Sequence, residues 1–301
     1  MMLVIALGGN AFAKTGSRVG SPKDQLEAVR EAAVDIVDMI QLGYRVVVTH
    51  GNGPQVGLIA ERISDSLSLD MAVAATEGWM GYLLVNAIED EAKRRGLSTR
   101  AVAVVTRVIV NSNDDAFRNP TKFIGPTYRE AEAIELSEVK GWVFKKDPRG
   151  GWRRVVPSPR PVSIVEADVI RQLISNGNIV IAVGGGGVPV INHEGVEAVI
   201  DKDLATQLLA NSINADELMI LSDVDYVYLN YGKPNQRPLT TIRINELRRY
   251  YDDGQFPEGN MGPKVEAAIR FIEGGGKRAY IGRLGKASEL IKGATGTIIL
   301  P

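Results

Sequence analysis

Apolar runs that lead into glycine-bearing loops recur along this chain, and this recurrence limits most strongly how it can fold. Residues 3–7 form a continuous apolar run before Gly8 and Gly9, and residues 45–49 lie shortly before Gly51. A continuous apolar run is typical of a parallel strand that is buried on both faces. Helical patterns separate the runs, and this alternation predicts an α/β fold with a mostly parallel central sheet.

Residues 21–43 carry the clearest helical pattern. Ser21 can cap the helix, Pro22 suits its first position, and Asp24 completes a capping box. Apolar residues then repeat at intervals of three and four, and Gly43 can end the helix in a left-handed conformation. Further helices are expected over residues 72–95 and 166–175, after Asp203 and near Lys264, and further strands over 101–106, near 164, and over 179–183, 219–221, 279–281 and 297–300.

The alternation breaks between residues 111 and 160, where the composition turns polar. Within this segment, residues 142–146 and 152–156 favour strands and flank a turn sequence at 147–151, which predicts a hairpin. We interpret residues 111–160 as an inserted lid that protrudes from a chain otherwise organised as one domain over residues 1–301.

Composition excludes several classes of function. The 35 basic and 36 acidic side chains leave a net charge of −1, whereas a nucleic-acid-binding protein needs a clustered positive excess. The absence of cysteine excludes disulfides and thiolate chemistry, and with only two histidines any bound metal would need oxygen ligands. No secretory leader is evident, and asparagines and glycines interrupt the uncharged stretch over 172–193, so we expect a cytoplasmic enzyme with no membrane span.

Three glycine loops are candidates for a phosphate-binding site. Ligands of an open α/β sheet bind at the carboxyl ends of its strands, so loops that follow strands should open on one crevice. Glycine lets backbone N–H groups approach an anion closely. One such loop is better explained as a tight turn, but three together favour phosphate binding, although neither standard nucleotide-binding fingerprint occurs. The loops are Gly8-Gly9-Asn10, Gly51-Asn52-Gly53-Pro54-Gln55 and Gly184-Gly185-Gly186-Gly187.

Two lysines near these loops are candidates for phosphoryl transfer, which depends on positioning and on neutralising charge on the transferred oxygens. Lys202 stands between Asp201 and Asp203 at an expected strand-to-helix junction, although this segment alone is better explained as a helix cap with a surface lysine. Lys264 falls in the first turn of an expected helix. The helix dipole disfavours a cation there unless an anion lies nearby, which indicates an anion close to Lys264.

Two further segments leave their roles open. Ser222 and Asp223 follow the strand expected over residues 219–221 and can contact a ribose or Mg²⁺, but an ordinary turn explains them equally well. His50 ends an expected strand, where a histidine is more often a packing or turn residue than a catalyst.

Together these segments resemble the amino-acid kinase superfamily, and within it the branch that phosphorylates carbamate. The resemblance covers essentially the whole chain. Its most discriminating matches lie in the insertion, at residues 119–122 and 151–159, because related acetylglutamate, aspartate and uridylate kinases lack this sequence. Small departures are Phe123 in place of the usual proline, Asn260 in place of serine and Ser222 in place of threonine. The other matching segments are residues 5–11, 49–57, 184–190, 201–205 and 261–265.

This resemblance implies a three-layer α/β/α sandwich and an ATP:carbamate phosphotransferase, which interconverts MgATP and carbamate with MgADP and carbamoyl phosphate. It implies an acceptor-binding lobe over residues 1–200, lid included, and a nucleotide-binding lobe over residues 201–301. Mg²⁺ would arrive with ATP or ADP rather than occupy a dedicated protein site. A homodimer and a role in arginine metabolism are also implied, with neither nucleic acid nor membrane as a partner.

The resemblance also implies roles for individual residues. Lys202 and Lys264 would stabilise the transferring phosphoryl group, and Asp203 would orient both lysines. Lys122 would reach the phosphate site from the lid. The residues expected to line the carbamate and γ-phosphate site are Gly8, Gly9, Asn10, Gly51, Asn52 and Gly53. The residues expected near the nucleotide are Gly184, Gly185, Ser222, Asp223, Met261 and Gly262.

Two alternatives stay open at this point. The chain can be another kinase of the superfamily that acts on a carboxylate or phosphate acceptor, or a non-catalytic nucleotide-binding regulator on the same scaffold. Retention of Lys202, Asp203 and Lys264 argues against a regulator. An amino-acid acceptor would bring an extra charged group that is usually met by arginine or lysine. None of the three glycine loops carries a cation, and we expect Lys14 and Arg18 to be exposed.

Overall fold

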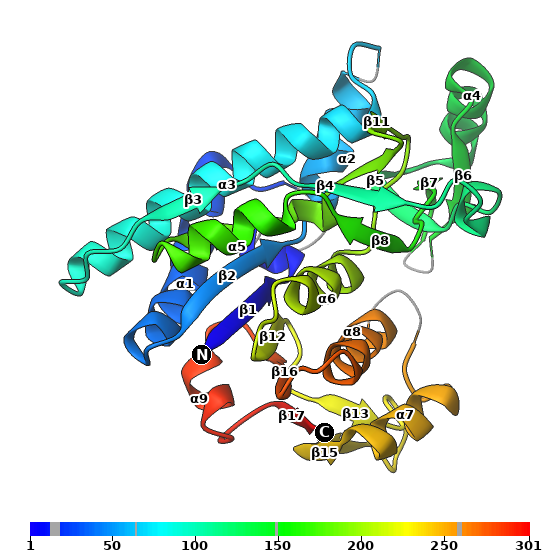
Figure 1. Cartoon of the computed structure of the whole chain (residues 1–301). Coiled ribbons are helices and arrows are strands. Elements are labelled where there is room, and N and C mark those ends of the chain that lie inside the picture. The colour runs from blue at the N-terminus through cyan, green and yellow to red at the C-terminus, as the bar shows by residue number, and fades with distance from the viewer. Residues whose placement is uncertain (13–18, 64, 148–149, 258–260) are drawn as a thin grey trace.

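A central sheet of eight strands organises the molecule (Figure 1). The structure is a computed structural model that describes residues 1–12, 19–63, 65–147, 150–257 and 261–301. The strand order is β15-β17-β16-β12-β1-β2-β9-β3, and among the described residues every neighbouring pair is parallel except β16 with β17. The strands are β1 (Met2–Leu7), β2 (Arg45–His50), β3 (Ala101–Ala103), β9 (Ile179–Ile181), β12 (Glu217–Ser222), β15 (Thr241–Arg243), β16 (Arg278–Arg283) and β17 (Thr297–Leu300).

Helices cover both faces of this sheet, because its central strands are apolar on both faces. Along β1, Leu3 and Ile5 pack into one core with α1 and α3, while Val4 packs into the opposite core with α6 and α8. All three side chains are fully buried, and burial of one such side chain contributes about 2 kcal/mol. The expected three-layer sandwich is confirmed. The helices of the two outer layers are α1 (Pro22–Gln41), α3 (Leu69–Arg94), α5 (Ala167–Ser175), α6 (Lys202–Ser212), α7 (Ile244–Asp252), α8 (Met261–Glu273) and α9 (Ala287–Ile291).

The ends of α1 form as the sequence predicts. The Oγ of Ser21 accepts a hydrogen bond of 3.2 Å from the backbone N–H of Asp24, whose Oδ2 accepts one of 2.9 Å from the N–H of Ser21. Pro22 occupies the first helical position, and Gly43 follows the helix with a φ of 86°. Loss of a cap of this kind typically costs about 1 kcal/mol.

The insertion builds a separate three-stranded sheet, which protrudes at the upper right of Figure 1. The expected hairpin is confirmed: β6 (Val143–Lys146) and β7 (Trp152–Val156) pair antiparallel, with Lys146 opposite Trp152. On its other edge β7 pairs with β5 (Lys122–Tyr128), and α4 (Glu130–Lys140) connects β5 to β6. We call residues 111–160 the lid and the rest of the described chain the body.

Three elements have no clear pattern in the sequence. The helix α4 buries only Ala133, so it has no apolar stripe that would predict it. Gly125 and Pro126 interrupt the strand pattern of β5. The helix α2 (Gly53–Arg62) begins inside the second glycine loop, where glycine and proline indicate a turn rather than a helix.

The strand predicted over residues 101–106 is wrong in its second half. It ends as β3 at Ala103, and β4 (Arg107–Val110) belongs to another sheet, of order β11-β10-β4-β8. Thr106 separates the two strands, since its Oγ1 donates to the carbonyl of Val104 and accepts from the N–H of Val183. These side-chain hydrogen bonds replace ladder bonds at the break.

The remaining strands are β8 (Pro161–Ile164), β10 (Val188–Ile191), β11 (Glu194–Gly195), and the pair β13 (Val227–Leu229) and β14 (Arg237–Leu239).

None of the helices in the described ranges is both long and apolar enough to cross a lipid bilayer.

Candidate active site

The three glycine loops meet at one edge of the central sheet. β1, β2 and β9 are parallel neighbours, so their carboxyl ends lie together. The loops approach one another so closely that side chains would not fit. A Cβ on Gly51 would lie 3.3 Å from the backbone nitrogen of Gly9, and one on Gly185, whose φ is 66°, would overlap the side chain of Asn52. The predicted convergence of these loops is confirmed.

Asp203 holds two lysines at this edge. Lys202 Nζ donates to its Oδ1 at 2.6 Å, and Lys264 Nζ donates to its Oδ2 at 2.9 Å. All three side chains are nearly buried. Burial alone would raise the pKa of the Asp203 carboxyl, but the charges of Lys202 and Lys264 outweigh it and hold the pKa well below its usual range. Asp203 therefore stays ionised and fixes both ammonium groups.

Lys122 reaches the same place from the lid. It is the first residue of β5, and its Nζ donates to Oδ2 of Asp201 at 2.9 Å. The other oxygen of Asp201 caps α6 by accepting from the backbone N–H of Asp203 at 2.9 Å. The lid is thus linked by one carboxylate to the start of the helix that carries Lys202 and Asp203.

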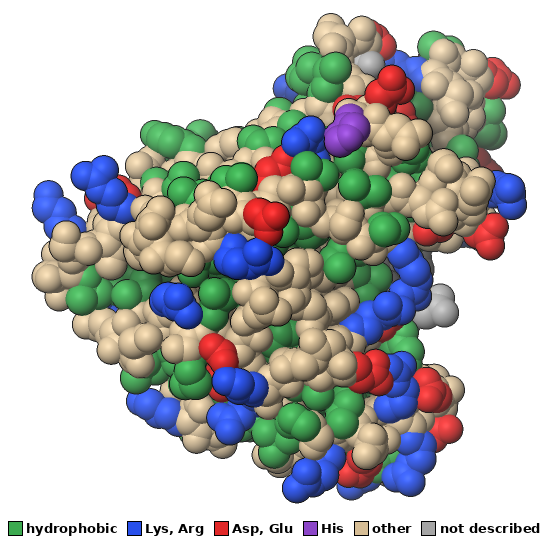
Figure 2. Space-filling view, in the orientation of Figure 1, with side chains coloured by type: hydrophobic (Ala, Val, Ile, Leu, Met, Phe, Trp, Pro, Cys, Tyr) green, Lys and Arg blue, Asp and Glu red, His purple; other side chains and the backbone are tan. Residues whose placement is uncertain are grey.

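The resulting cluster has an excess of positive charge, because three lysines share two carboxylates. Figure 2 shows that the molecule is hollowed on its right side, between the lid and the region of α7 and α8, with Lys and Arg side chains along the hollow. A concave surface lined by one sign of charge attracts ligands of the opposite sign. The arrangement is suited to a phosphate group.

The start of α8 explains why a lysine occupies a first helical turn. α8 begins at Met261, and Lys264 points to Asp203, which offsets the unfavourable dipole. Burial lowers the pKa of the Lys264 ammonium group, but Asp203 outweighs this effect and the pKa lies above its usual value. The anion that the sequence indicates near Lys264 is therefore present as a carboxylate of the chain itself.

His50 is a packing residue in this structure. It is fully buried, its ring lies 5.3 Å from that of Phe12, and its Nδ1 lies 3.2 Å from the carbonyl oxygen of Gly51. Burial lowers the pKa of the imidazole to about 4, so the ring is neutral at physiological pH. This agrees with the sequence-based interpretation.

Glu77 places a buried carboxyl group beside the glycine loops. The sequence pattern does not identify this residue. Its Oε2 accepts a hydrogen bond of 2.7 Å from the backbone N–H of Thr106. Gly184 passes so close that a Cβ there would lie 2.9 Å from Glu77 Cγ and 2.5 Å from His50 Nε2. Burial raises the pKa of Glu77 well above its usual value. Its only signal in the sequence is an acid within the apolar face of a long helix.

An aromatic cavity lies at the other end of the site. It is lined by Val224, Tyr226, Tyr228, Tyr231, Phe256, Pro257 and Met261, and has a volume of about 70 Å³. The sequence places three tyrosines within six residues here, and this clustering is the signal that could identify the cavity. Because Met261 is also the first residue of α8, the cavity and Lys264 are neighbours on one helix.

The other predicted nucleotide residues divide between two places. Ser222 ends β12 and donates to Asp223 at 3.1 Å, while Gly262 packs against the carbonyl of Pro257 at the aromatic cavity. Gly184 and Gly185 instead lie against His50 and Asn52. The side chain of Asn10, and residues Lys14, Arg18 and Asn260, lie outside the part of the chain that is described.

The fold and the lysine cluster define a phosphotransferase of the amino acid kinase class, and comparison with known proteins agrees. The sequence profile of the amino acid kinase family matches residues 1–283, and the chain belongs to this family. The carbamate kinase of Pyrococcus horikoshii is 50% identical in an alignment of length 311 that covers 99% of each chain. The structure of carbamate kinase from Giardia lamblia bound to AMP-PNP has a TM-score of 0.91 and 42% identity, with 99% of this chain and 98% of that chain covered. A protein from Aeropyrum pernix K1 has a TM-score of 0.94 and 48% identity, with 100% and 99% covered.

Proposed function

We propose that this protein is an ATP:carbamate phosphotransferase, which interconverts MgATP and carbamate with MgADP and carbamoyl phosphate. The observation that carries the proposal is the cluster of Lys122, Lys202 and Lys264 around Asp201 and Asp203, at the edge where three glycine loops meet. Relatives that match essentially the whole chain are carbamate kinases.

The chemistry needs little beyond positioning and charge. An oxygen of carbamate attacks the γ-phosphorus of ATP, the bond from that phosphorus to the β–γ bridging oxygen breaks, and ADP leaves with the electron pair. The attacking oxygen is already anionic, so no general base is required. Lys202 and Lys264 would neutralise charge on the transferring oxygens, and Asp203 would hold both ammonium groups in place before the reaction begins.

The nucleotide would bind toward the C-terminal part of the site. The aromatic cavity can take the apolar faces of an adenine ring, and Asp223, which is exposed beside Lys264, lies where a ribose or Mg²⁺ could be contacted. Within the described residues, no group of three His, Asp or Glu side chains could hold a metal ion by itself. Mg²⁺ would enter bound to the phosphates of ATP or ADP, because phosphate oxygens are ligands that it prefers.

The acceptor would bind among the close-packed glycine loops. Carbamate is a small planar anion that backbone N–H groups can surround. Gly9 and Gly53, where a Cβ would meet nothing within 4 Å, leave room for it beside the closely packed Gly8, Gly51 and Asn52. These loop residues include no arginine or lysine for a second charged group of an amino-acid acceptor.

A panel of acceptors tests this choice. With Mg²⁺ present, the purified protein should form ATP from ADP and carbamoyl phosphate and should show little ATP-dependent phosphorylation of acetylglutamate, aspartate or uridylate. Efficient turnover of one of these three, with carbamoyl phosphate inert, would favour another kinase of the same family. Nucleotide binding without turnover of any of them would favour a regulator.

We also propose that the enzyme is a cytoplasmic homodimer. One face of α3 supports a second copy as partner, since its exposed positions are uncharged along four turns. Met71 and Tyr82 are 53% and 65% exposed there, and Ala75 and Gly78 between them would let a partner approach closely. The absence of cysteine is compatible with a reducing compartment.

A further inference from the structure

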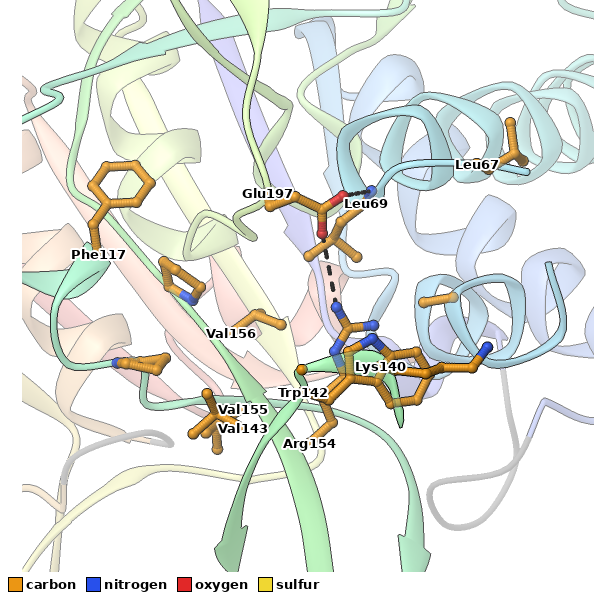
Figure 3. A pocket seen from close by; sticks show the side chains of 14 residues that line it. Leu67, Leu69, Phe117, Lys140, Trp142, Val143, Arg154, Val155, Val156 and Glu197 are labelled. Atoms are coloured by element: carbon orange, nitrogen blue, oxygen red, sulfur yellow. Dashed lines mark hydrogen bonds and ion pairs between the residues drawn. The ribbon is translucent and has the colours of Figure 1, made fainter. Parts of the chain in front are cut away.

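A second cavity lies at the junction between the lid and the body (Figure 3). Its volume of about 450 Å³ falls within the range of small-molecule sites, and its lining includes none of the lysines of the candidate active site. The lid contributes Trp142, Val143 and Arg154. The body contributes Leu67, which lies between α2 and α3, and Leu69, the first residue of α3. An occupant would therefore contact both parts of the molecule at once.

Arg154 is the unusual residue of this cavity. Its side chain is 13% exposed, yet within the described ranges its guanidinium has no partner at hydrogen-bond distance. The carboxylate of Glu197 lies 3.7 Å from it, and Glu197 also accepts a shorter bond of 2.7 Å from the backbone N–H of Leu69. None of the Arg154 nitrogens is a fully buried donor without a partner, so the N–H groups that Glu197 does not engage stay open to the cavity and can donate to a bound acceptor.

Stacking does not replace that acceptor. The guanidinium carbon of Arg154 lies 4.1 Å from the centre of the Trp142 ring, as Figure 3 illustrates. Such stacking uses the face of the guanidinium, whereas its N–H groups donate within its own plane. Burial also lowers the pKa of Arg154, which Glu197 only partly opposes. The arginine is held over the indole, and its donors are still available.

The surrounding charges favour an anion with a single negative charge. Glu197 is already close to Arg154 and would repel a dianion such as phosphate. Lys140 also lines the cavity, 5.3 Å from the Trp142 ring, but it pairs with Asp65 at 3.1 Å. A carboxylate matches the fork of an arginine and carries one charge.

We propose that this cavity binds a small organic carboxylate, whose carboxylate group pairs with Arg154 while its apolar part lies against Trp142, Val143 and Leu69. Leucine and valine side chains on the wall would exclude water from the apolar part of the ligand. The site is separate from the phosphate site and does not depend on the proposed reaction.

A ligand in this cavity would contact β7, the strand that pairs with β5 and so with Lys122. In the antiparallel ladder of β5 and β7, Arg154 stands opposite Ile124, and Val156 stands opposite Lys122. Paired residues project from the same face of a sheet, so Arg154 and Lys122 both face the body from the lid. A ligand that bridges lid and body at Arg154 would restrict the position of Lys122, two residue pairs along the ladder.

Tryptophan fluorescence can test this site without any turnover, because Trp142 forms one wall. Benzoate serves as the probe and benzamide as a neutral match of the same shape. We expect benzoate to change the emission saturably at millimolar concentration, and benzamide to bind at least about tenfold more weakly. Calorimetry with the same two compounds provides a second readout.

Matched substitutions decide whether Arg154 is responsible. Arg154→Met keeps an apolar stem against Trp142 and should weaken benzoate binding at least about tenfold, and Arg154→Lys should restore part of it. Arg129→Met, which removes an exposed lid arginine, should bind benzoate as the wild type does. Urea unfolding midpoints establish that each variant is folded. Equal binding of benzoate and benzamide, unchanged binding by Arg154→Met, or neither heat nor emission change up to about 50 mM benzoate would overturn the proposal.

Discussion

Lys264, in the first turn of α8, donates a 2.9 Å hydrogen bond to Asp203, which lies in the first turn of α6 and 61 residues earlier in the chain. Lys202 occupies the other oxygen of the same carboxylate. Two lysines are therefore positioned by one acid before any substrate is bound. This arrangement leads to the first two predictions.

Lys202→Ala should lower kcat on the order of 10²-fold or more, because it removes one preorganised charge from the transferring phosphoryl group. Nucleotide affinity should change much less, since the aromatic cavity is untouched. Steady-state kinetics in both directions measures the two effects. Lys233→Ala, at an exposed position, is the control for loss of a lysine. A Lys202→Ala enzyme with nearly wild-type kcat would show that the assignment is wrong.

Asp203→Asn should destabilise the protein by about 3–5 kcal/mol, because two buried ammonium groups would lose their common partner. Urea unfolding monitored by circular dichroism measures the change. Asp90→Asn, on the exposed face of α3, should shift stability by less than about 0.5 kcal/mol. If both variants unfold at the same urea concentration, Asp203 does not hold the lysines together as described.

Asp35 should make stability pH-dependent through the contact of α1 with α9. It accepts from the backbone N–H groups of Gly285 and Ala287, and burial raises its pKa from 3.8 to about 6. The folded state therefore holds the proton more tightly than the unfolded state, and the stability from protonated Asp35 is present below about pH 4 and lost as the pH rises through about 6. The full effect is about 3 kcal/mol.

An Asp35→Asn variant isolates this effect. The difference in unfolding free energy between wild type and variant should change by about 3 kcal/mol from pH 4 to pH 7. The wild type should lose stability relative to the variant as the pH rises. Urea denaturation at half-unit pH steps gives the difference curve. A difference that stays flat over this range would contradict the raised pKa.

Lys122→Ala should impair turnover without unfolding the protein, because Lys122 joins the site from the lid through a single partly exposed ion pair with Asp201 among the described residues. We predict that the lid closes over bound substrates and excludes water from carbamoyl phosphate, a labile acyl phosphate. Hydrogen exchange with and without ADP and carbamoyl phosphate should show greater protection of the lid, residues 111–160, when both are present. Lys146→Ala, an exposed lysine of the same lid, should behave as the wild type. Equal protection in both states would count against lid motion.

Features set by neighbouring residues could be predicted from the sequence. The Ser21 cap, the Gly43 end of α1 and the hairpin of β6 and β7 each depend on contacts within a few positions. The convergence of the glycine loops was also predictable, since it follows from the order of parallel strands.

Features set by distant residues could not be predicted in this way. The residues near Lys264 do not identify Asp203 as its partner, which only the family resemblance implies, and nothing near Glu77 shows that it packs beside Gly184. The same holds for Arg154, whose sequence context shows a charged strand residue and whose burial arises only where the lid meets the body. Tertiary packing, rather than local pattern, decides these positions.

Formation of ATP from ADP and carbamoyl phosphate, measured side by side for the wild type and Lys264→Ala, tests the central claim most directly. The wild type should produce ATP with release of carbamate, and Lys264→Ala should be slower on the order of 10²-fold while still binding ADP. Inability of the folded wild type to make ATP, or equal rates in the two proteins, would contradict phosphoryl transfer at the lysine cluster around Asp203.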